Sequence, residues 1–329
     1  MKENPTTQPA CKTTIGGQAL IEGLLMIGPE KRAMAVRQAD GTIIVEQLPL
    51  SPSSSKAAEI PFIRGSVRLF RQLVTGTKAL LRSAELSEEP ETEAEVDNPT
   101  KEAPRMSALD RFFERHTNLM LYGSVVLGLL FSVGLFILLP NFITSLFNQF
   151  TPLGQLTGGG GQIARNLIEG VIRIAIFIGY LYFASRLKDI QRVWQYHGAE
   201  HKTIATYEAG KELTVENARQ YSRLHPRCGT AFMFIVIIVS IITFSLVGWH
   251  GRWVNLLLRL VLTPIVAGIA YEIIRLAGRY DNALTRAISK PGLLLQHLTT
   301  AEPDDSMLEV AIAAMNAVRP QTAGTQDKW

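Results

Sequence analysis

The chain has 329 residues, of which 47% are hydrophobic and 19% are charged, and its formal net charge is +4. A soluble protein usually carries about 25% charged residues, so this composition argues against an ordinary soluble domain. The small positive charge does not indicate a nucleic-acid partner, and basic residues at membrane edges explain it better. The two cysteines, Cys11 and Cys228, are too few for a disulfide framework.

The N-terminal part of the chain predicts a short disordered segment followed by a small folded region. Residues 1–12 are polar and lack the apolar stretch of a secretory signal, so we expect them to be disordered. A cytoplasmic N-terminal region is predicted over residues 13–84. Its first segment, Ile15 to Pro29, contains four glycines, which indicate tight turns or close backbone approach rather than a phosphate loop. Residues 33–48 predict a β-hairpin that turns at Asp40-Gly41.

A helix and two linkers are predicted next. Residues 51–59 are rich in serine and proline and predict a linker. Residues 61–86 combine an apolar stripe with a basic face. Such a helix either lies on an anionic membrane surface or packs against the protein's own spans. Residues 85–104 predict a flexible acidic linker, whose shortening should leave expression and assembly nearly unchanged.

The middle of the chain predicts membrane spans. Residues 117–164 contain no Asp, Glu, Lys, Arg or His, a run long enough to cross a bilayer. We therefore predict a membrane region over 105–290, with four spans near 119–139, 165–185, 230–249 and 253–274. The second span carries Glu169 and Arg173, which lie four residues apart on one helix face and can pair. The expected fold class is a mainly α-helical polytopic membrane protein with a small α+β cytoplasmic N-terminal region.

The distribution of basic residues predicts the orientation. The loop 186–229 contains eight Lys and Arg residues, whereas the connection between the third and fourth spans contains only Arg252. The positive-inside rule therefore places this loop, both termini and the tail 291–329 in the cytoplasm. Within the tail we expect a helix over 306–318, capped by Ser306 with Glu309 three residues later.

The predicted cytoplasmic loop carries a cluster of histidine, glutamate and cysteine. In a helix, His197 and His201 lie on one face, Glu200 lies beside that face, and Glu208 returns to it after about three turns of roughly 3.6 residues. His-x-x-Glu-His is also the ligand order of the inverted zinc-peptidase motif. Downstream, His225 and Cys228 supply a second pair of candidate ligands. The competing interpretation is a polar helix face with ordinary hydrogen bonds.

Two classes of function follow from this cluster. In the first, His197 and His201 bind a divalent metal, most simply zinc, with His225, Cys228 or Glu208 as the third ligand. Glu200 then acts as the general base of a hydrolase at the cytoplasmic membrane face. In the second, the protein is a non-catalytic scaffold, assembly factor or transporter component, with a closed structural metal site or with no metal.

Four stretches together resemble one known family. They are Ile15-Gly-Gly-Gln-Ala19 with Ile21-Glu-Gly23, Tyr196-His-Gly-Ala-Glu-His-Lys202, His225-Pro-Arg-Cys-Gly-Thr230, and Pro291-Gly292 through Glu302-Pro-Asp-Asp305. Over residues 13–318 the chain is similar to the YqhQ-like family of bacterial membrane proteins, a domain of unknown function sometimes labelled a predicted metal-dependent enzyme. The resemblance implies a multi-pass protein of the bacterial inner membrane, with the lipid bilayer as partner. It leaves open a homo-oligomer or other membrane proteins as further partners, and it supplies no substrate.

Overall fold

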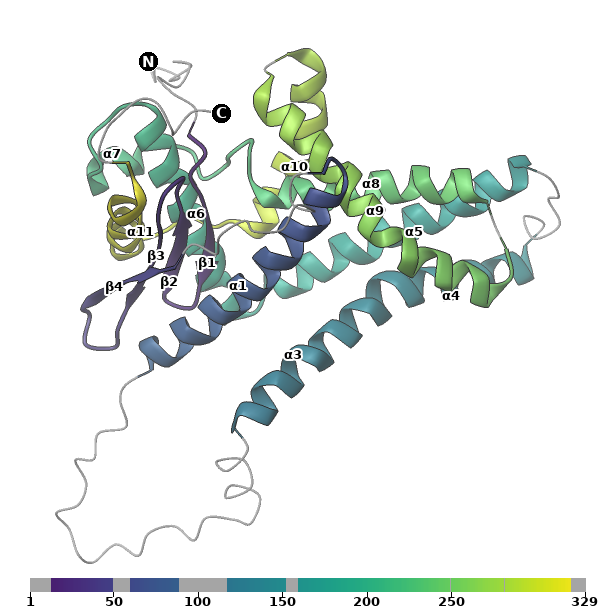
Figure 1. The fold of residues 1–329 in the computed structure, drawn as a ribbon, viewed down its shortest axis with the longest axis horizontal. Helices are drawn as coiled ribbons and strands as arrows, with labels where there is room; N and C mark the ends of the chain where they lie inside the picture. Colours follow the sequence, from purple (N-terminus) through teal and green to yellow (C-terminus); the bar gives the residue numbers. More distant parts are fainter. Residues whose placement is uncertain are drawn as a thin grey trace, which may run out of the picture. The chain divides into compact units, whose positions relative to one another are not determined.

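The protein is described by a computed structural model, shown in Figure 1. The described residues are 13–49, 60–88, 117–151, 159–248, 250–280 and 282–320. The predicted disordered start at 1–12, the linker at 51–59, most of the acidic linker at 85–104 and the last nine residues lie outside them. The chain forms two compact units. The first contains 1–89, 179–240 and 261–329, and the second contains 90–178 and 241–260.

The first unit contains a four-stranded antiparallel sheet in which each strand pairs with the next along the chain. The strands are β1 Gly16–Leu20, β2 Gly23–Ile27, β3 Arg32–Arg37 and β4 Ile43–Leu48. The expected hairpin over 33–48 is present as β3 and β4. The segment Ile15 to Pro29 was not expected to form strands, yet β1 and β2 pair across a tight turn at Ile21-Glu22. Three of its glycines lie within the strands and do not interrupt the ladder, and Gly28 follows β2. At Gly17 and Gly23 the backbone of the neighbouring strand lies so close that an added Cβ would overlap with it.

Both faces of this sheet are covered by helices (Figure 1). Successive residues of a strand point to opposite faces, so Leu24 and Leu25 enter different cores. Leu24 belongs to the core shared with α6 Lys188–Glu208 and α11 Asp305–Val318. Leu25 belongs to the core that includes Ala79 of α1 Ile63–Ser87. Each fully buried aliphatic side chain stabilises this arrangement by roughly 1.5–3 kcal/mol.

The C-terminal helices confirm one expectation and correct another. Helix α11 runs over Asp305–Val318, close to the predicted range. Its cap is Asp304 instead of the expected Ser306, because the Asp304 carboxylate accepts a hydrogen bond of 3.0 Å from the Met307 N–H. Helix α10, Ala283–Thr299, was not expected because Pro291 lies within it. A reciprocal cap between Asn282 and Thr285 starts this helix. A short helix, α7, covers Val215–Arg219.

Among the described residues, three helices are long and apolar enough to cross a membrane: Gly123–Phe150, Gly160–Ala184 and Trp253–Ala277. The first of these comprises most of α3 Thr117–Val133, the π-helical turn η2 Gly134–Leu138 and α4 Leu139–Phe150. The second belongs to α5 Gly159–Ala184, and the third belongs to α9 Arg252–Arg279. The first continues past Pro140, near which the sequence placed the end of the span, with a continuation over Phe142–Phe150 as one of two alternatives. A π-helical turn immediately before the proline widens the backbone at that point, which relieves the usual clash of its ring. Helix α8, Gly229–Val247, is also apolar, but its apolar part Phe232–Val247 is shorter, so three helices rather than four meet the length criterion.

A buried charged group links two helices of the second unit. Arg173 donates to Glu169 over 2.7 Å, which confirms the predicted pair. Arg259 of α9 also donates to Glu169, with its Nε 2.8 Å from Oε1. All three side chains are almost completely shielded from solvent. Glu169 therefore holds two arginines, from two helices, where the sequence indicated one.

Candidate metal centre

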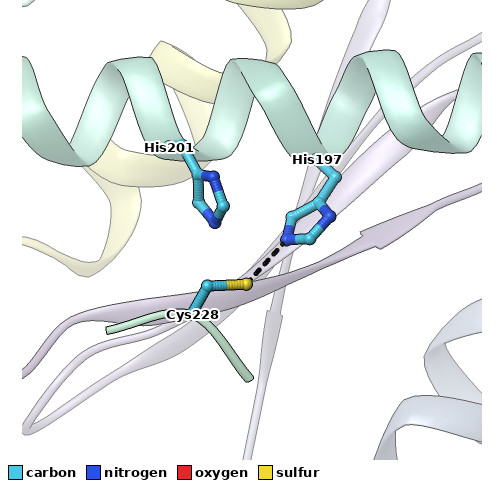
Figure 2. A group of neighbouring side chains, drawn as sticks. All are labelled: His197, His201 and Cys228. Atoms are coloured by element: carbon cyan, nitrogen blue, oxygen red, sulfur yellow. Dashed lines mark hydrogen bonds between the residues drawn. The ribbon is translucent and has the colours of Figure 1, made fainter. Parts of the chain in front are cut away.

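Helix α6 presents two imidazoles on one face. His197 and His201 are four residues apart, and their ring centroids lie 4.5 Å from each other. Both rings project from the same side of the helix toward Cys228 (Figure 2). The helix runs without proline from Lys188 to Glu208, so its 3.6-residue periodicity holds throughout the motif. The local part of the predicted cluster is therefore built by helical geometry alone.

Cys228 completes a group of three candidate ligands. It lies just before α8, in a tight turn where its N–H donates to the His225 carbonyl over 3.4 Å. Its Sγ is 3.2 Å from His197 Nε2, and the candidate ligand atoms of His197, His201 and Cys228 all lie within 4.8 Å of one another. The N–H and hydroxyl groups of Thr230 also point at Sγ, at 3.5 and 3.3 Å. Donors of this kind stabilise negative charge on sulfur.

Backbone carbonyl groups orient both imidazoles. His197 Nδ1 is 2.7 Å from the Thr299 carbonyl oxygen, and His201 Nδ1 is 2.6 Å from the Arg223 carbonyl oxygen. A carbonyl oxygen can only accept, so each Nδ1 carries a proton, and in the neutral imidazole Nε2 then keeps the lone pair. Both lone pairs belong to the atoms nearest the centre of the group. Histidine ligands of metal ions are held in this way in known sites.

The pKa values of His201 and Glu200, two neighbouring residues of α6, are shifted by burial. Burial lowers the pKa of His201, although its interaction with Cys228 works in the opposite direction, so the neutral imidazole is favoured. Burial raises the pKa of Glu200, against smaller opposing effects of His197 and of the Gly17 N–H. A neutral imidazole can bind a metal ion. A buried carboxyl group with a raised pKa can hold and transfer a proton.

The other two predicted ligands lie to one side of this group. The His225 ring centroid is 5.5 Å from that of His201, but His225 Nε2 is 3.6 Å from Glu208 Oε2. Glu208 also accepts from the Thr13 N–H over 2.8 Å and pairs with Arg227. Burial raises the pKa of Glu208, but the hydrogen bond from His225 and the charge of Arg227 outweigh it, and the net shift is downward. Glu208 is therefore a carboxylate engaged in its own network.

Residues distant in the sequence hold the Cys228 turn, and the sequence analysis did not identify them. The side-chain amide of Gln296 forms two hydrogen bonds of 2.8 Å with the backbone of His225.

Gly198, inside the histidine motif, lets the Ala301 carbonyl approach α6 so closely that an added Cβ would overlap with it. A glycine in the interior of a helix could have indicated such an approach. Nothing in the sequence could have indicated Thr299, which contributes only its backbone carbonyl.

A cavity of about 670 Å³ in the first unit reaches the three ligands and Glu200. Its volume is in the range of small-molecule sites. The β1 strand and helices α1, α6 and α9 all contribute to its wall. Gly17 lets the β1 backbone lie against the Glu200 carboxyl, since an added Cβ would stand only 3.0 Å from its Cδ. The candidate ligands and the candidate proton carrier thus face one shared space.

The spacing of the three ligands suits a zinc ion. Zinc bonds of about 2.0–2.3 Å at tetrahedral angles place neighbouring ligand atoms about 3.3–3.6 Å apart. The distance of 3.2 Å between His197 Nε2 and Cys228 Sγ lies just below this range. The upper limit of 4.8 Å on the distances among all three candidate ligand atoms lies above it. The donor set of two imidazole nitrogens and one sulfur is also one that zinc binds.

Comparison with known proteins gives a family without an assigned activity. The model of a family described as "Protein of unknown function (DUF1385)" matches residues 60–321. The uncharacterized protein YqhQ of Bacillus subtilis (strain 168) is 36% identical over 305 residues, which cover 92% of this chain and 91% of the relative. No solved structure matches the chain.

Proposed function

We propose that this chain, which belongs to the DUF1385 family and is YqhQ-like, is a zinc-dependent hydrolase of the bacterial inner membrane. The observation that carries the proposal is the orientation of His197 and His201. Each donates Nδ1–H to a backbone carbonyl and turns Nε2 toward Cys228. Histidines that bind metal ions typically donate their other ring N–H to such an acceptor, which orients the ring. Two histidines oriented in this way toward one thiol therefore favour a metal site over ordinary hydrogen bonding.

Three protein ligands and a buried carboxyl group support catalysis over a purely structural site. Zinc with three protein ligands keeps a position for water and lowers the pKa of that water to about 7. Glu200 is buried and lines the same cavity as all three ligands. Its raised pKa suits it to take a proton from the attacking water and pass it to the leaving group. A cavity open to substrate beside the ligands is what a hydrolase requires.

One observation favours the alternative of a non-catalytic scaffold, assembly factor or transporter component. The His225 ring lies 5.5 Å from that of His201, close enough for a rotation to supply a fourth ligand. Four protein ligands would close the site and make it structural. In the structure, however, His225 faces Glu208, and it therefore stays outside the proposed ligand set.

The packing of the first unit supports four membrane crossings. The sheet, α6 and α11 share one core, so residues 13–88, 188–229 and 305–318 lie on the same side of any membrane. An even number of crossings must therefore separate α6 from α11. Among the described residues between them, α9 is long and apolar enough to cross, and we propose that α8 supplies the second crossing. Helix α8 has 19 residues, about 28 Å at 1.5 Å per residue, which matches a hydrocarbon core of about 30 Å. With the positive-inside rule, the site and both termini are cytoplasmic.

The first test is the metal content of the full chain, purified without added metal. We expect about one zinc per chain, and loss of that zinc in His197→Ala and Cys228→Ser because each removes a ligand. His297→Ala is the matched control, since His297 is exposed on α10. A chain that carries no metal, or a His197→Ala variant that keeps it, would contradict the proposal.

Glu200→Gln separates catalysis from a structural role. Glutamine keeps the shape and leaves the ligands in place, so metal content should be unchanged. Activity should fall by about a hundredfold or more, the usual contribution of a positioned base. The measurement is complementation of a growth or envelope phenotype of the null strain, with Glu212→Gln, an exposed glutamate, as control. Full complementation by Glu200→Gln at normal protein level would end the hydrolase proposal.

A further inference from the structure

Helix α1 begins against α9, within a candidate membrane span. Arg64 donates to Glu272 over 2.6 Å, and the Ser66 hydroxyl donates to the Pro264 carbonyl. Both α9 residues belong to the candidate span Trp253–Ala277, so α1 begins beside a helix that we propose to cross the bilayer.

The surface of α1 is divided into three faces. Gly76, Ala79 and Ser83 face the sheet and are buried. Large apolar side chains on another face remain exposed, among them Phe70 at 67% and Leu73 at 57%. A basic row lies on the third face: Arg64, Arg68, Arg71, Lys78 and Arg82. An apolar face beside a basic one is typical of helices that lie in the surface of an anionic leaflet.

The cavity lies between these helices and the candidate metal centre. Its wall includes Leu69 of α1, Ile274 of α9 and Phe232 of α8, together with Trp194 and Glu200 of α6. One cavity thus borders two helices that we propose to cross the bilayer and the group that we propose to carry out hydrolysis.

Trp194 lies in the wall of this cavity beside the candidate ligands, and its ring centroid is 6.3 Å from that of His197. Most of the cavity surface is apolar, which suits a hydrocarbon chain.

We propose that the cavity binds an acyl chain of a membrane lipid, drawn from the cytoplasmic leaflet, with its ester carbonyl beside the metal centre. That the lipid is a substrate rests on the proposed function, whereas its binding does not. In the reaction, the water oxygen bonds to the acyl carbon and the carbon–oxygen bond of the ester breaks. The proton taken by Glu200 passes to the leaving alkoxide, so that a fatty acid and an alcohol are released.

Fluorescence quenching by brominated lipid tests this binding. The chain contains Trp194, Trp249, Trp253 and Trp329, so a variant with the last three changed to Phe reports on the cavity alone. The full chain is placed in vesicles of phosphatidylglycerol, either unmodified or brominated at carbons 9 and 10 of its acyl chains. A variant that keeps only Trp253, which is 79% exposed on a candidate span, measures quenching by lipid outside the cavity. Trp194 should lose about as large a fraction of its emission as Trp253.

Gly16→Phe is the blocking variant. Gly16 lines the cavity, and an added Cβ there meets no atom within 4 Å, so phenylalanine fills space without displacing the backbone. It should abolish the quenching of Trp194 and leave that of Trp253 unchanged. Trp194 that keeps its emission while Trp253 is quenched would overturn the proposal, and a hydrophobic peptide as the true occupant would give that result.

Metal content of the same preparations separates this inference from the proposed function. Quenching of Trp194 in a chain without zinc supports the lipid site and removes the hydrolase. Zinc in a chain whose Trp194 is not quenched supports the metal centre and contradicts the proposed lipid site. Release of fatty acid from the vesicles, lost in Glu200→Gln but with quenching retained, supports both.

Discussion

At the scale of single residues, the candidate site depends on backbone groups as much as on side chains. The Thr299 and Arg223 carbonyls determine which nitrogen of each histidine is free. Loss of such a supporting contact typically weakens metal binding by about 10–100-fold. The orientation of the imidazoles should therefore be sensitive to changes that move residues 299–301, even where no ligand is changed.

Gly198→Ala tests this dependence. The added methyl group overlaps with the Ala301 carbonyl, so the segment that carries Thr299 must move away from α6. We expect a loss of about 1–3 kcal/mol in stability, typical of overpacking. Zinc affinity, measured by competition with a chelator, should fall as well. Gly179→Ala in α5 is the control, because an added Cβ meets nothing there, and it should be neutral or slightly stabilising. Equal melting temperatures and affinities for both variants would contradict the proposed role of the carbonyl.

His225→Ala distinguishes three ligands from four. His225 faces Glu208 instead of the candidate ligands, so its removal should leave the metal content of the purified chain unchanged. Stability should fall modestly, because Glu208 keeps Arg227 and the Thr13 N–H as partners. Cys228→Ala, measured beside it, should lose the metal. Loss of zinc from His225→Ala would identify a closed structural site and favour the scaffold.

At the scale of secondary-structure elements, charge holds apolar helices together in the second unit. Glu169 and Arg173 of α5 and Arg259 of α9 form a buried cluster, and both arginines lie over the ring of Phe244 in α8. Buried ion pairs give little net stability compared with apolar residues, but losing one partner leaves charges without compensation. The cluster therefore specifies which helix faces meet.

Glu169→Leu should be strongly destabilising. It removes the carboxylate shared by Arg173 and Arg259, and the expected cost is about 3–5 kcal/mol. Thermal unfolding in detergent and the level of inserted protein measure it. Leu167→Ala, at a half-exposed position of the same helix, should have little effect. The triple change of Glu169→Leu, Arg173→Met and Arg259→Met should recover most of the stability. A triple variant no more stable than Glu169→Leu would show a role for the arginines beyond this pairing.

At the scale of the whole molecule, the core of the first unit constrains the topology. Three segments widely separated in the sequence share that core, so they must all reach the same compartment. In the proposed topology, the apolar length of α8 alone leaves its crossing undecided, whereas the shared core requires α8 and α9 to cross together. Packing within the first unit would thus constrain a helix that we propose to cross the membrane.

Reporter fusions test the four crossings. A fusion after Gly210 should report the cytoplasm, and fusions at Gly160 and after Gly251 should report the opposite side. The expectation follows from the parity of crossings and from the basic residues of the loop 186–229. A fusion at Gly160 or after Gly251 that reports the cytoplasm would contradict this topology, and a fusion after Val318 provides the cytoplasmic control.

The sequence by itself determined the features that depend on neighbouring residues. Uncharged apolar runs predicted the candidate spans, and helical periodicity placed His197 and His201 together. We could also predict the hairpin β3–β4 and the pair Glu169–Arg173, because each is formed by residues close together in the sequence. The strands β1 and β2 were missed because glycine within an apolar segment more often marks a turn than a covered strand.

Only the tertiary structure decided which residues complete the site. The sequence offered three candidates for the third ligand, namely His225, Cys228 and Glu208, and gave no reason to choose among them. In the structure Cys228 lies beside the two histidines, whereas His225 and Glu208 pair with each other. That choice depends on the turn at 225–228, which Gln296 holds from 71 residues away. Periodicity describes neighbours along one helix, whereas contacts at this separation arise only when packing in the shared core offsets the entropy of ordering the chain between them.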